Sequence, residues 1–507
     1  MSRSGPRRGA RVSSNPVAPS LPPVTLLDAA SSVAGAEVRG ASNPGEIEIR
    51  DVAFDSGNVT VGSLFFCVAG AVADGHSFAR SAVEAGAAAL VVERWLDVGA
   101  PQVRVASVRD AMGPMSAVVF GRPAESMVMV GITGTNGKTT ITYLLESIFD
   151  AAEMASGVIG TTGARIKGSP LMLARTTPEA PDLNRLLARM RDAGVRVVAL
   201  EVSSHALAQG RVDGVVFDVA LFTNLSQDHL DYHASMEAYF AAKARLFTPA
   251  LARSAVVNAE DPWGRRMLEA PSIPTTTFAV EASADLRATG VVSTIEGLWF
   301  SVDGLDVRSH LRGLFNVSNC LGAIAVARAI GIDDEAIVAG IERLPGVPGR
   351  VEAVDAGQDF LVVVDYAHTP DSIHGVLLAA RPLASGRLIV VFGCGGDRDR
   401  AKRPLMGAAA TSAADLTVLT SDNPRSEDPL AIIAEIEPGA LKGGGAYVIE
   451  PERRAAIRLA LREARKGDVV VIAGKGHEPY QELAAETLPF DDREVAREEL
   501  HTLGAQL

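Results

Sequence analysis

The sequence has few cysteines, few aromatic residues and no excess of positive charge. Its three cysteines, Cys67, Cys320 and Cys394, are far apart, and no CxxC pair occurs among the 507 residues. This usage predicts no disulfide framework and is typical of a protein from a reducing cytosol. Lysine and arginine number 48 against 61 aspartate and glutamate residues, a net charge of −13. Such a balance argues against a nucleic-acid-binding surface.

Long apolar runs are also absent. No run reaches the ~18 residues that a membrane-spanning helix needs, so we expect no membrane span. Residues 1–24 carry four arginines among serines and prolines without an apolar segment, which predicts a disordered tail and not a signal peptide. Apolar residues make up 47% of the chain, ample for several cores. At ~150 residues per domain, the length predicts about three domains.

Alternating strand and helix patterns predict an α/β protein. Residues 25–122 have the pattern of a small α/β domain. Residues 123–344 alternate strand and helix patterns around a glycine-rich loop, and residues 345–507 form a third α/β unit. Apolar, β-branched runs in the central and C-terminal regions predict mostly parallel strands that are buried on both faces.

A glycine-rich loop at residues 131–140 has the composition of a phosphate-binding site. An apolar run at residues 127–130 predicts a buried strand before it, and residues 141–152 predict a helix after it. Backbone N–H groups and the helix N-terminus attract anions, Lys138 would reach the β- and γ-phosphates, and a threonine hydroxyl would hold Mg²⁺. The strict G-x-x-x-x-G-K-[ST] pattern is not met, because Ile132 replaces its first glycine. A glycine turn without a ligand is the alternative.

Two features downstream of the loop have both a chemical and a structural interpretation. Glu201 ends an apolar strand pattern and is either a metal ligand or a surface carboxylate. His229 and His233 lie four residues apart in DHLDYH, which indicates either a metal or phosphate site or a polar loop that caps the next helix. A zinc site is disfavoured, because no third ligand follows at a zinc spacing.

Lys243 falls in the middle of an apolar helical face. Met236, Tyr239, Phe240 and Phe247 make up that face. The lysine therefore either extends to solvent or is a functional group that loses its charge or meets an anion. Further on, Asn316 and Asn319 open an alanine-rich helix, where amide side chains more often cap the helix than contact a nucleotide.

Four strand patterns of the C-terminal region end in polar motifs. These motifs are DYAHTP at 365–370, GCGGDR at 393–398, DNPR at 422–425 and GKGHE at 474–478. Because the carboxyl ends of parallel strands meet at one edge of a sheet, we expect a ligand site there. Arg398 and Arg425 are suited to forked recognition of carboxylates.

Taken in order, these motifs resemble those of the Mur ligases of peptidoglycan synthesis. The matching set is GTNGKTT (134–140), TTP (176–178), EVSSH (201–205), NLSQDHLDYH (224–233), Lys243, Asn316 with Asn319, DYAHTP, GGDRD (395–399), DNPR and GKGHE. The resemblance extends over about residues 50–480, and the ordered set is very specific although each motif alone is weak. It implies an N-terminal domain that binds the UDP end of a nucleotide sugar, a central P-loop-type ATP-binding domain and a C-terminal Rossmann-like domain for the incoming amino acid.

Within the family, the resemblance is to members that add meso-diaminopimelate to UDP-MurNAc-L-Ala-D-Glu in the cytoplasm. The implied catalytic residues are Lys138, Lys243, His229 and Glu201, with Lys243 carbamylated to N6-carboxylysine. The implied Mg²⁺ ligands are Thr139, Glu201, His229 and Lys243. The implied ATP-binding residues are Gly134, Thr135, Asn136, Gly137, Lys138, Thr139, Thr140, Asn316, Asn319, Arg350 and Asp365. Those implied for the UDP-MurNAc-dipeptide are Ser56, Thr176, Thr177, Ser203 and Arg211, and those for diaminopimelate are Arg398, Asp422, Asn423, Pro424, Arg425, Gly474 and Glu478.

The resemblance also bears on the alternatives. Ile132 is normal for the family's loop and no longer counts against phosphate binding. Lysine-adding relatives lack the arginine of DNPR, so Arg425 favours diaminopimelate. A lysine-adding homologue and a folylpolyglutamate synthetase-like ligase are the nearest alternatives. A non-catalytic nucleotide-binding protein would not need the implied metal ligands together with the phosphate-loop lysine. We expect a monomer.

Overall fold

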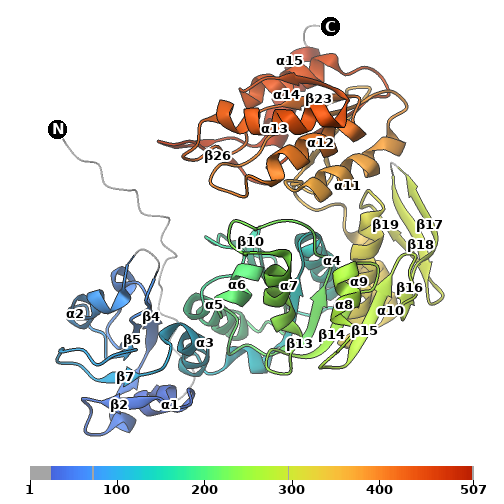
Figure 1. Ribbon diagram of the computed structural model, residues 1–507. Coiled ribbons are helices and arrows are strands. Elements are labelled where there is room, and N and C mark those ends of the chain that lie inside the picture. The colour runs from blue at the N-terminus through green and yellow to red at the C-terminus, as the bar shows by residue number, and fades with distance from the viewer. Residues whose placement is uncertain (1–23, 71–72, 295, 505–507) are drawn as a thin grey trace, which may run out of the picture. The chain divides into compact units, whose positions relative to one another are not determined.

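The computed structural model describes residues 24–70, 73–294 and 296–504 (Figure 1). The predicted disordered tail lies outside the described residues, except for Val24, which begins the first strand. The chain divides into two compact units: residues up to Ala124 together with Ala180–Ala193, and Glu125–Glu179 together with Gly194–Leu507. None of the helices in the described ranges is long and apolar enough to cross a membrane.

The first unit is a small α/β domain around a five-stranded sheet. Its elements are β1 (Val24–Thr25), α1 (Leu26–Ser31), β2 (Glu37–Arg39), β3 (Glu48–Ile49), β4 (Asp51–Ala53), β5 (Ser63–Phe66), α2 (Ala79–Glu84), β6 (Ala89–Val92), β7 (Gln102–Arg104), α3 (Val108–Val119) and α5 (Ala180–Asp192). The strand order is β2-β7-β6-β5-β4, with β2 antiparallel to β7 and the other pairs parallel. Leu64 and Phe66 pack with α1 and α3, whereas Phe65 and Cys67 pack with α2. Both faces of this sheet are thus buried, which suits the apolar side chains that alternate along β5.

Helix α5 belongs to the first unit, although it lies within the predicted central domain of the sequence. It packs against α3. Arg185 donates hydrogen bonds to the Asp51 carboxylate and the Val52 carbonyl, and Arg191 donates to the Phe120 carbonyl. These contacts join segments far apart in the chain, so no local pattern could indicate them.

The second unit begins with a nine-stranded sheet. Its elements are β8 (Val128–Thr133), α4 (Lys138–Ala151), β9 (Ser156–Gly160), β10 (Gly163–Ile166), β11 (Ser169–Leu171), β12 (Val197–Glu201), α6 (Ser204–Ala208), β13 (Phe217–Phe222), α7 (Met236–Ala244), β14 (Ala252–Asn258), α8 (Pro262–Met267), β15 (Thr275–Ala279), β16 (Leu286–Arg287), β17 (Thr289–Thr294), β18 (Gly297–Val302), β19 (Leu305–Ser309), α9 (Phe315–Ala329) and α10 (Asp334–Arg343).

The sheet order puts the glycine-rich loop at the middle of this region. The order is β11-β10-β9-β12-β8-β13-β14-β15-β16, and every pair from β9 to β16 is parallel. Helices α4, α9 and α10, with the small antiparallel sheet β17–β19, bury one face. The loop therefore follows the carboxyl end of β8, between the ends of β12 and β13.

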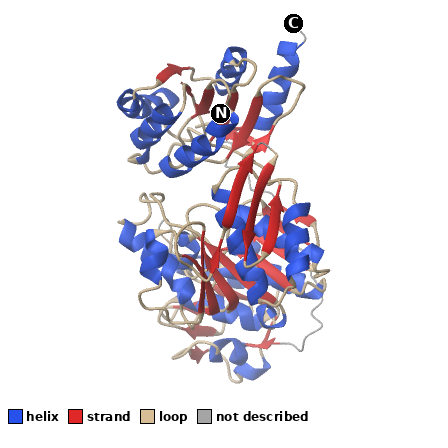
Figure 2. Cartoon of the chain, turned by 90° about the vertical axis from the view of Figure 1, so that its right-hand side faces the viewer, coloured by secondary structure: helices blue, strands red, loops and turns tan. Residues whose placement is uncertain are grey.

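The C-terminal part of the second unit is doubly wound. Its elements are β20 (Glu352–Ala353), β21 (Leu361–Asp365), α11 (Pro370–Ala380), β22 (Leu388–Phe392), α12 (Lys402–Ala413), β23 (Leu416–Leu419), α13 (Pro429–Gly443), β24 (Ala446–Ile449), α14 (Arg453–Glu463), β25 (Val469–Ala473), β26 (Tyr480–Glu482), β27 (Thr487–Pro489) and α15 (Asp492–Gly504). The strand order is β20-β21-β25-β22-β23-β24, and only β20 pairs antiparallel. Helices α11–α13 cover one face and α14 with α15 the other, so strands lie between helices (Figure 2). The predicted α/β class with mostly parallel sheets is confirmed.

Candidate active site

The glycine-rich loop joins the end of β8 to the start of α4. Gly134 has a φ of +150° and Gly137 a φ of +88°, values that side-chain-bearing residues rarely adopt. A Cβ at Gly134 would collide with the Thr223 hydroxyl, and one at Gly137 would collide with the Asn319 amide oxygen. No side chain caps the N-terminus of α4, where Gly137 is the N-cap residue. The backbone N–H groups of the first turn of α4 therefore suit an anion.

Side chains that follow β13 hold the loop in this shape. The Asn224 amide oxygen accepts a hydrogen bond from the Asn136 N–H at 2.9 Å, and its Nδ2 donates to the Asn136 carbonyl at 3.2 Å. The Thr223 hydroxyl donates to the same carbonyl at 2.7 Å. The loop is therefore rigid before any ligand binds, which lowers the entropic cost of binding a phosphate.

Two lysine side chains, the half-buried Lys138 and the buried Lys243, share the carbonyl of Gly134. Lys138 Nζ donates to the carbonyls of Gly134 and Thr135 at 2.8 Å, and Lys243 Nζ donates to that of Gly134 at 2.9 Å. Burial lowers the pKa of Lys138, partly offset by Glu201. Burial, and then the charge of Lys138, hold the pKa of Lys243 well below its usual range. The pair is stable only if an anion joins it or one lysine loses its positive charge.

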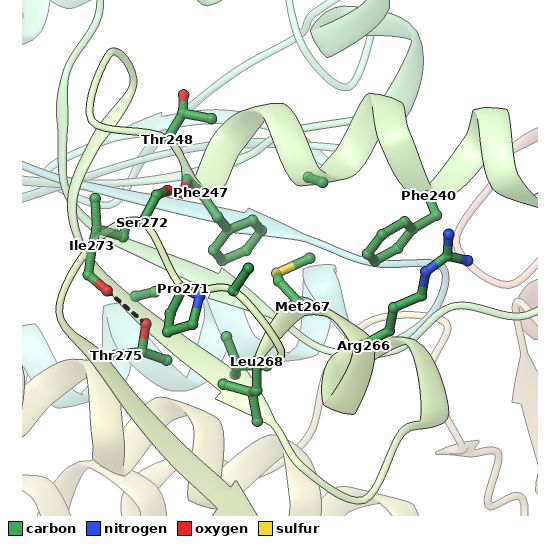
Figure 3. A pocket seen from close by; sticks show the side chains of 14 residues that line it. Phe240, Phe247, Thr248, Arg266, Met267, Leu268, Pro271, Ser272, Ile273 and Thr275 are labelled. Carbon is green, nitrogen blue, oxygen red and sulfur yellow. Dashed lines mark hydrogen bonds between the residues drawn. The ribbon is translucent and has the colours of Figure 1, made fainter.

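Helix α7 has two different buried faces. Tyr239 and Lys243 are buried on the face toward the glycine-rich loop (residues 131–140), called the phosphate loop below. Phe240, Ala244 and Phe247 instead line an apolar cavity of about 270 Å³ between α7, α8 and the segment after α8 (Figure 3). The predicted single face for Tyr239, Phe240 and Phe247 is wrong, because adjacent helical residues point about 100° apart. The predicted burial of Lys243 is confirmed.

Glu201 and His229 belong to the same edge of the nine-stranded sheet, at the carboxyl ends of its strands. Glu201 ends β12, is 1% exposed and accepts hydrogen bonds from the Thr161 N–H and hydroxyl at 3.1 and 2.9 Å. The alternative of a surface carboxylate is therefore wrong. His229 follows β13, and burial lowers its pKa to about 3, against the opposing effect of Asp228. Its ring is neutral at pH 7 and has a nitrogen lone pair to offer a metal.

The donor chemistry around the loop fits Mg²⁺ under one condition. Within the described ranges, no three or more His, Cys, Asp or Glu side chains form a metal-binding group. The implied set contains two such residues, Glu201 and His229, with the hydroxyl of Thr139 and the side chain of Lys243. Mg²⁺ prefers oxygen ligands, and an ammonium group has no lone pair. The set therefore fits Mg²⁺ only if Lys243 carries a carboxylate.

Four residues implied for the muramoyl-dipeptide form one connected group. The Thr177 hydroxyl donates to the Glu201 carbonyl at 2.8 Å and accepts from the Ser203 N–H at 3.1 Å. Arg211 donates to the Thr177 carbonyl at 3.1 Å, and the Thr176 hydroxyl lies 3.2 Å from that of Thr161. The structure therefore places these residues beside the end of β12. Ser56 lies in the first unit, at the start of a short 3-10 turn.

The residues implied for the nucleotide base and ribose are partly occupied by internal contacts. Asn316 donates to the Arg312 carbonyl and accepts from Asn319 Nδ2, each at 2.7 Å. The predicted capping role of both asparagines is wrong, because Leu314 is the N-cap of α9 and both amides lie inside the helix.

Arg350 and Asp365 lie close together in the C-terminal part. The Asp365 carboxylate accepts hydrogen bonds from the N–H groups of Val351 and Ala367, both at 2.8 Å. The Arg350 guanidinium stacks over the Tyr366 ring at 4.5 Å and lies 3.3 Å from the Thr139 hydroxyl. Arg350 thus extends toward the phosphate loop.

The four polar strand ends of the C-terminal sheet line one cavity of about 350 Å³. The lining residues that belong to motifs singled out in the sequence are Asp228, His229, Asp231, Tyr366, His368, Gly393, Cys394, Gly395, Arg398, Asp399, Asp422, Asn423, Arg425, Gly474 and Glu478. Pro424 does not line it, and its carbonyl packs against Gly396. The cavity thus combines guanidinium groups with carboxylates, which suits a ligand that carries both charges.

Arg425 is fixed at this cavity by three contacts. Its Nε lies 2.8 Å from Glu482 Oε2, and its Nη1 donates to the Gly396 carbonyl at 2.8 Å. Its backbone N–H donates to the Glu482 carbonyl at 3.0 Å. The residue has a φ of +51°, which these contacts hold in place.

Family models match three parts of the chain. The "Mur ligase family, catalytic domain" matches residues 48–117, the "Mur ligase middle domain" residues 132–327, and the "Mur ligase, glutamate ligase domain" residues 349–476. These matches cover more than half of the sequence. The chain belongs to the Mur ligase family.

Relatives and solved structures agree with the family. Proteins named UDP-N-acetylmuramoyl-L-alanyl-D-glutamate–2,6-diaminopimelate ligase are 47% identical in Solibacter usitatus (90% of this chain, 95% of the relative) and 45% identical in Streptomyces avermitilis (98% and 99%). A solved structure with the same name has a TM-score of 0.69 at 33% identity, covering 95% of this chain and 99% of that one. A Mycobacterium tuberculosis folylpolyglutamate synthase has a TM-score of 0.60 at 20% identity, covering 76% of this chain and 93% of that one, which shows a shared fold alone.

Sequence reasoning missed two charged residues of the site in this Mur ligase. Lys402 lies 3.4 Å from the Asp228 carboxylate, and Glu482 pairs with Arg425. Both line the C-terminal cavity. Neither carries a local signal, since Lys402 begins an ordinary helix and Glu482 lies in a short strand after GKGHE.

We predict that Gly134→Ala raises the KM for ATP by at least about tenfold, because a Cβ there displaces Thr223 and so the loop carbonyl of Asn136. Steady-state kinetics with ATP as the varied substrate measure this. Gly168→Ala is the control, since Gly168 also has a positive φ (+78°) but open space around it. An unchanged KM for ATP in Gly134→Ala would contradict the assignment of the loop.

Proposed function

We propose that the chain catalyses the ATP-dependent addition of meso-diaminopimelate to the γ-carboxylate of D-glutamate in UDP-MurNAc-L-Ala-D-Glu. Relatives named for this reaction share 44–47% of their residues with the chain. The single observation that carries the proposal is the cavity where Arg398 and Arg425 lie with Asp422 and Glu478. Guanidinium groups suit a carboxylate and the acids suit an ammonium group, which are the two groups at the free end of diaminopimelate.

The phosphate loop supplies the first step. Lys138 and the N-terminus of α4 would hold the β- and γ-phosphates of ATP. The D-glutamate carboxylate attacks the γ-phosphorus, the bond to ADP breaks, and an acyl phosphate forms. Mg²⁺, held by Thr139, Glu201, His229 and carbamylated Lys243, would neutralise charge on the transferring phosphate.

Carbamylation of Lys243 removes the conflict between the two lysines. Burial and the nearby charge of Lys138 both favour the neutral amine of Lys243. That amine can form an N–C bond with CO₂ and release a proton, which leaves a carbamate anion. A carbamate attracts both Lys138 and a metal ion, whereas an ammonium repels them.

In the second step, the amino acid would bind in the cavity of about 350 Å³ at the C-terminal strand ends, called the amino-acid cavity below. A neutral amine of diaminopimelate attacks the acyl carbon and the amide C–N bond forms. The acyl C–O bond breaks, and phosphate leaves with its electron pair and takes up the proton that the nitrogen loses. The cavity includes Asp228 and His229 from the loop after β13, the same loop that contributes to the proposed metal site. The amine and the acyl phosphate therefore meet in one cavity, and bringing two reactants together in this way lowers the barrier.

Selection against lysine follows from the arginines. Lysine has an ammonium but no carboxylate at its free end, so it would offer no carboxylate to the guanidinium groups of Arg425 and Arg398, which would then keep only their internal acceptors. Losing a charged hydrogen-bond partner costs more than losing an apolar contact. Diaminopimelate is therefore preferred over lysine.

The remaining features of the proposal concern the setting of the reaction. The UDP-linked precursor would bind through the first unit, including Ser56. We place the reaction in the cytoplasm, as a step in the synthesis of cell-wall precursors, and expect a monomer. A non-catalytic nucleotide-binding protein would gain nothing from a lysine pair at the phosphate loop.

Phosphate release tests the function directly. With ATP, Mg²⁺ and UDP-MurNAc-L-Ala-D-Glu present, we expect rapid release with meso-diaminopimelate and release at least about 100-fold slower with L-lysine at equal concentration. Omission of either the nucleotide sugar or the amino acid should abolish it. Equal rates with both amino acids would favour a lysine-adding enzyme, and release without either acceptor would favour a plain ATPase.

Arg425→Ala should raise the KM for diaminopimelate by about 10- to 100-fold, the value of one or two charged hydrogen bonds. The KM for ATP should stay within about twofold of wild type. Arg400→Ala is the matched control, because Arg400 lies in a neighbouring loop, is exposed and pairs with Glu435. A parallel loss of ATP and diaminopimelate affinity would show that Arg425 supports the fold instead.

Lys243→Ala should abolish ligation, and short carboxylates such as acetate or propionate should restore part of the rate by replacing the carbamate. The matched variant is Lys138→Ala, which should be equally inactive but should not respond to carboxylates, since it lacks a cation. Single-turnover phosphate release with 0 and high carboxylate concentration measures both. Full activity of Lys243→Ala without any addition would falsify the proposed carbamate.

A further inference from the structure

Lys475 is a buried lysine to which the proposed reaction assigns no role. It follows the inner strand β25, between Gly474 and Glu478, which both line the amino-acid cavity. Its side chain is 0% exposed, and it is not among the residues that line the cavity. Lys475 therefore cannot touch a bound amino acid, and any effect on recognition must pass through its neighbours.

The hydrogen-bond and ion-pair partners of the Lys475 ammonium are all acceptors. Its Nζ donates to Asn423 Oδ1 at 2.9 Å and to the Tyr480 carbonyl, and it lies 3.7 Å from Glu478 Oε2. Burial lowers the pKa of Lys475, and the charge of Asp422 opposes this effect most strongly. A buried ammonium with three acceptors is well satisfied, which is the condition under which a charge remains inside a protein.

The ammonium sets the orientation of the Asn423 amide. Because Lys475 can only donate, Asn423 must turn its oxygen toward it. The Glu482 N–H donates to the same oxygen at 3.0 Å. The amide nitrogen is thereby turned the other way, where it donates to Glu478 Oε2 at 2.9 Å. Asn423 is 2% exposed, so water cannot replace these partners.

The Glu478 carboxylate is held by this amide at the wall of the cavity. Its second oxygen accepts from the Tyr366 hydroxyl at 3.3 Å. Burial, and then the charge of Asp422, raise the pKa of Glu478, whereas the charge of Lys475 lowers it. Lys475 thus orients this carboxylate through Asn423 and also favours its ionised form, the form that can bind an ammonium group.

We propose that Lys475 is a positioning residue for amino-acid selection, which orients Asn423 and Glu478 toward the free ammonium group of diaminopimelate. The inference rests on the proposed function. It assigns the lysine of GKGHE to recognition of the ammonium end, whereas Arg425 and Arg398 serve the carboxylate end. The competing explanation is that Lys475 only anchors β26 through the Tyr480 carbonyl.

Lys475→Met tests the proposal, because methionine has a similar length and no donor. We expect the KM for diaminopimelate to rise about tenfold, while kcat and the KM values for ATP and the nucleotide sugar change by less than about twofold. Lys466→Met, at an exposed lysine nearby in the sequence, is the matched control and should match wild type. A uniform loss across all three substrates would support the anchoring explanation and overturn the proposal.

A double-mutant cycle with Glu478→Gln separates the two explanations further. If Lys475 acts through Glu478, adding Lys475→Met to Glu478→Gln should change the KM for diaminopimelate by less than about twofold. Full additivity of the two effects would overturn the proposal. Where Lys475→Met is unfolded by circular dichroism, Lys475→Gln tests the electrostatic part of the proposal through the pH profile, since its amide can still donate to Asn423 Oδ1 but carries no charge.

The pH dependence of the KM for diaminopimelate also separates the two explanations. If Lys475 only anchored β26, its replacement would leave this pH dependence unchanged. The charged or titratable groups around Glu478 are Asp422, Lys475, His368, Tyr366, Tyr480 and Arg453. Protonation of Glu478 removes its attraction for an ammonium group, so the KM for diaminopimelate rises as the pH falls. Without the charge of Lys475 the pKa of Glu478 is higher, and this rise should begin at a higher pH in Lys475→Met than in wild type. An identical profile would overturn the electrostatic part of the proposal.

Failure of this inference is distinguishable from failure of the proposed function. Wild-type protein without diaminopimelate-dependent phosphate release would refute the function itself. An active wild type with a Lys475→Met variant of unchanged KM for diaminopimelate would refute the inference alone.

Discussion

The phosphate loop of this Mur ligase depends on one interaction. Two lysine side chains donate hydrogen bonds to the same backbone carbonyl. Lys138 and Lys243 both donate to the carbonyl of Gly134, where Lys243 is buried and Lys138 is half-buried. Like charges so close in a dry environment repel strongly unless an anion is added. A phosphate between the lysines, or a carbamate on one of them, turns the repulsion into attraction. The loop is thereby prepared for an anionic ligand.

The rest of the central region serves to hold that arrangement. Glycines at 134 and 137 let the backbone pass where a side chain would collide with Thr223 or Asn319. Helix α7 presents Lys243 to the loop from one face and packs apolar side chains from another. A lysine at this position is costly to the stability of the domain, and proteins accept such costs mainly where function requires them.

The amino-acid end uses buried positive charge in a similar way. Arg453 is fully buried, pairs with Asp492 at 2.7 Å, and donates to the carbonyls of Ser421 and Ala473. It thereby joins the ends of β23 and β25, the strands that carry DNPR and GKGHE. Together with Lys475, it places positive charge behind the sheet edge. The charge of Lys475 opposes the burial that raises the pKa of the Glu478 carboxyl at that edge.

Apolar patterns and motif positions were enough to predict the fold class and the sheet edge at which the candidate ligand residues gather. Strands buried on both faces must be apolar along their whole length, so β12 and β25 are visible as continuous runs. The carboxyl ends of parallel strands necessarily share an edge, so the motifs after those strands must gather. Two predictions from local patterns were wrong. Asn316 lies inside its helix and not at the cap, and α5 packs with the first unit and not with the central sheet. Both outcomes depend on contacts with distant parts of the chain.

Which charged groups contact one another depends on tertiary packing and is not visible in local sequence patterns. Lys243 reaches a carbonyl 109 residues away, and Lys475 reaches Asn423 across 52 residues. Glu482 pairs with Arg425 from a short strand that has no distinctive sequence. Periodicity reports the burial of a side chain but not the identity of its partner. The partner depends on how distant segments pack, and that packing settles which lysine orients an amide and which shares the carbonyl of the phosphate loop.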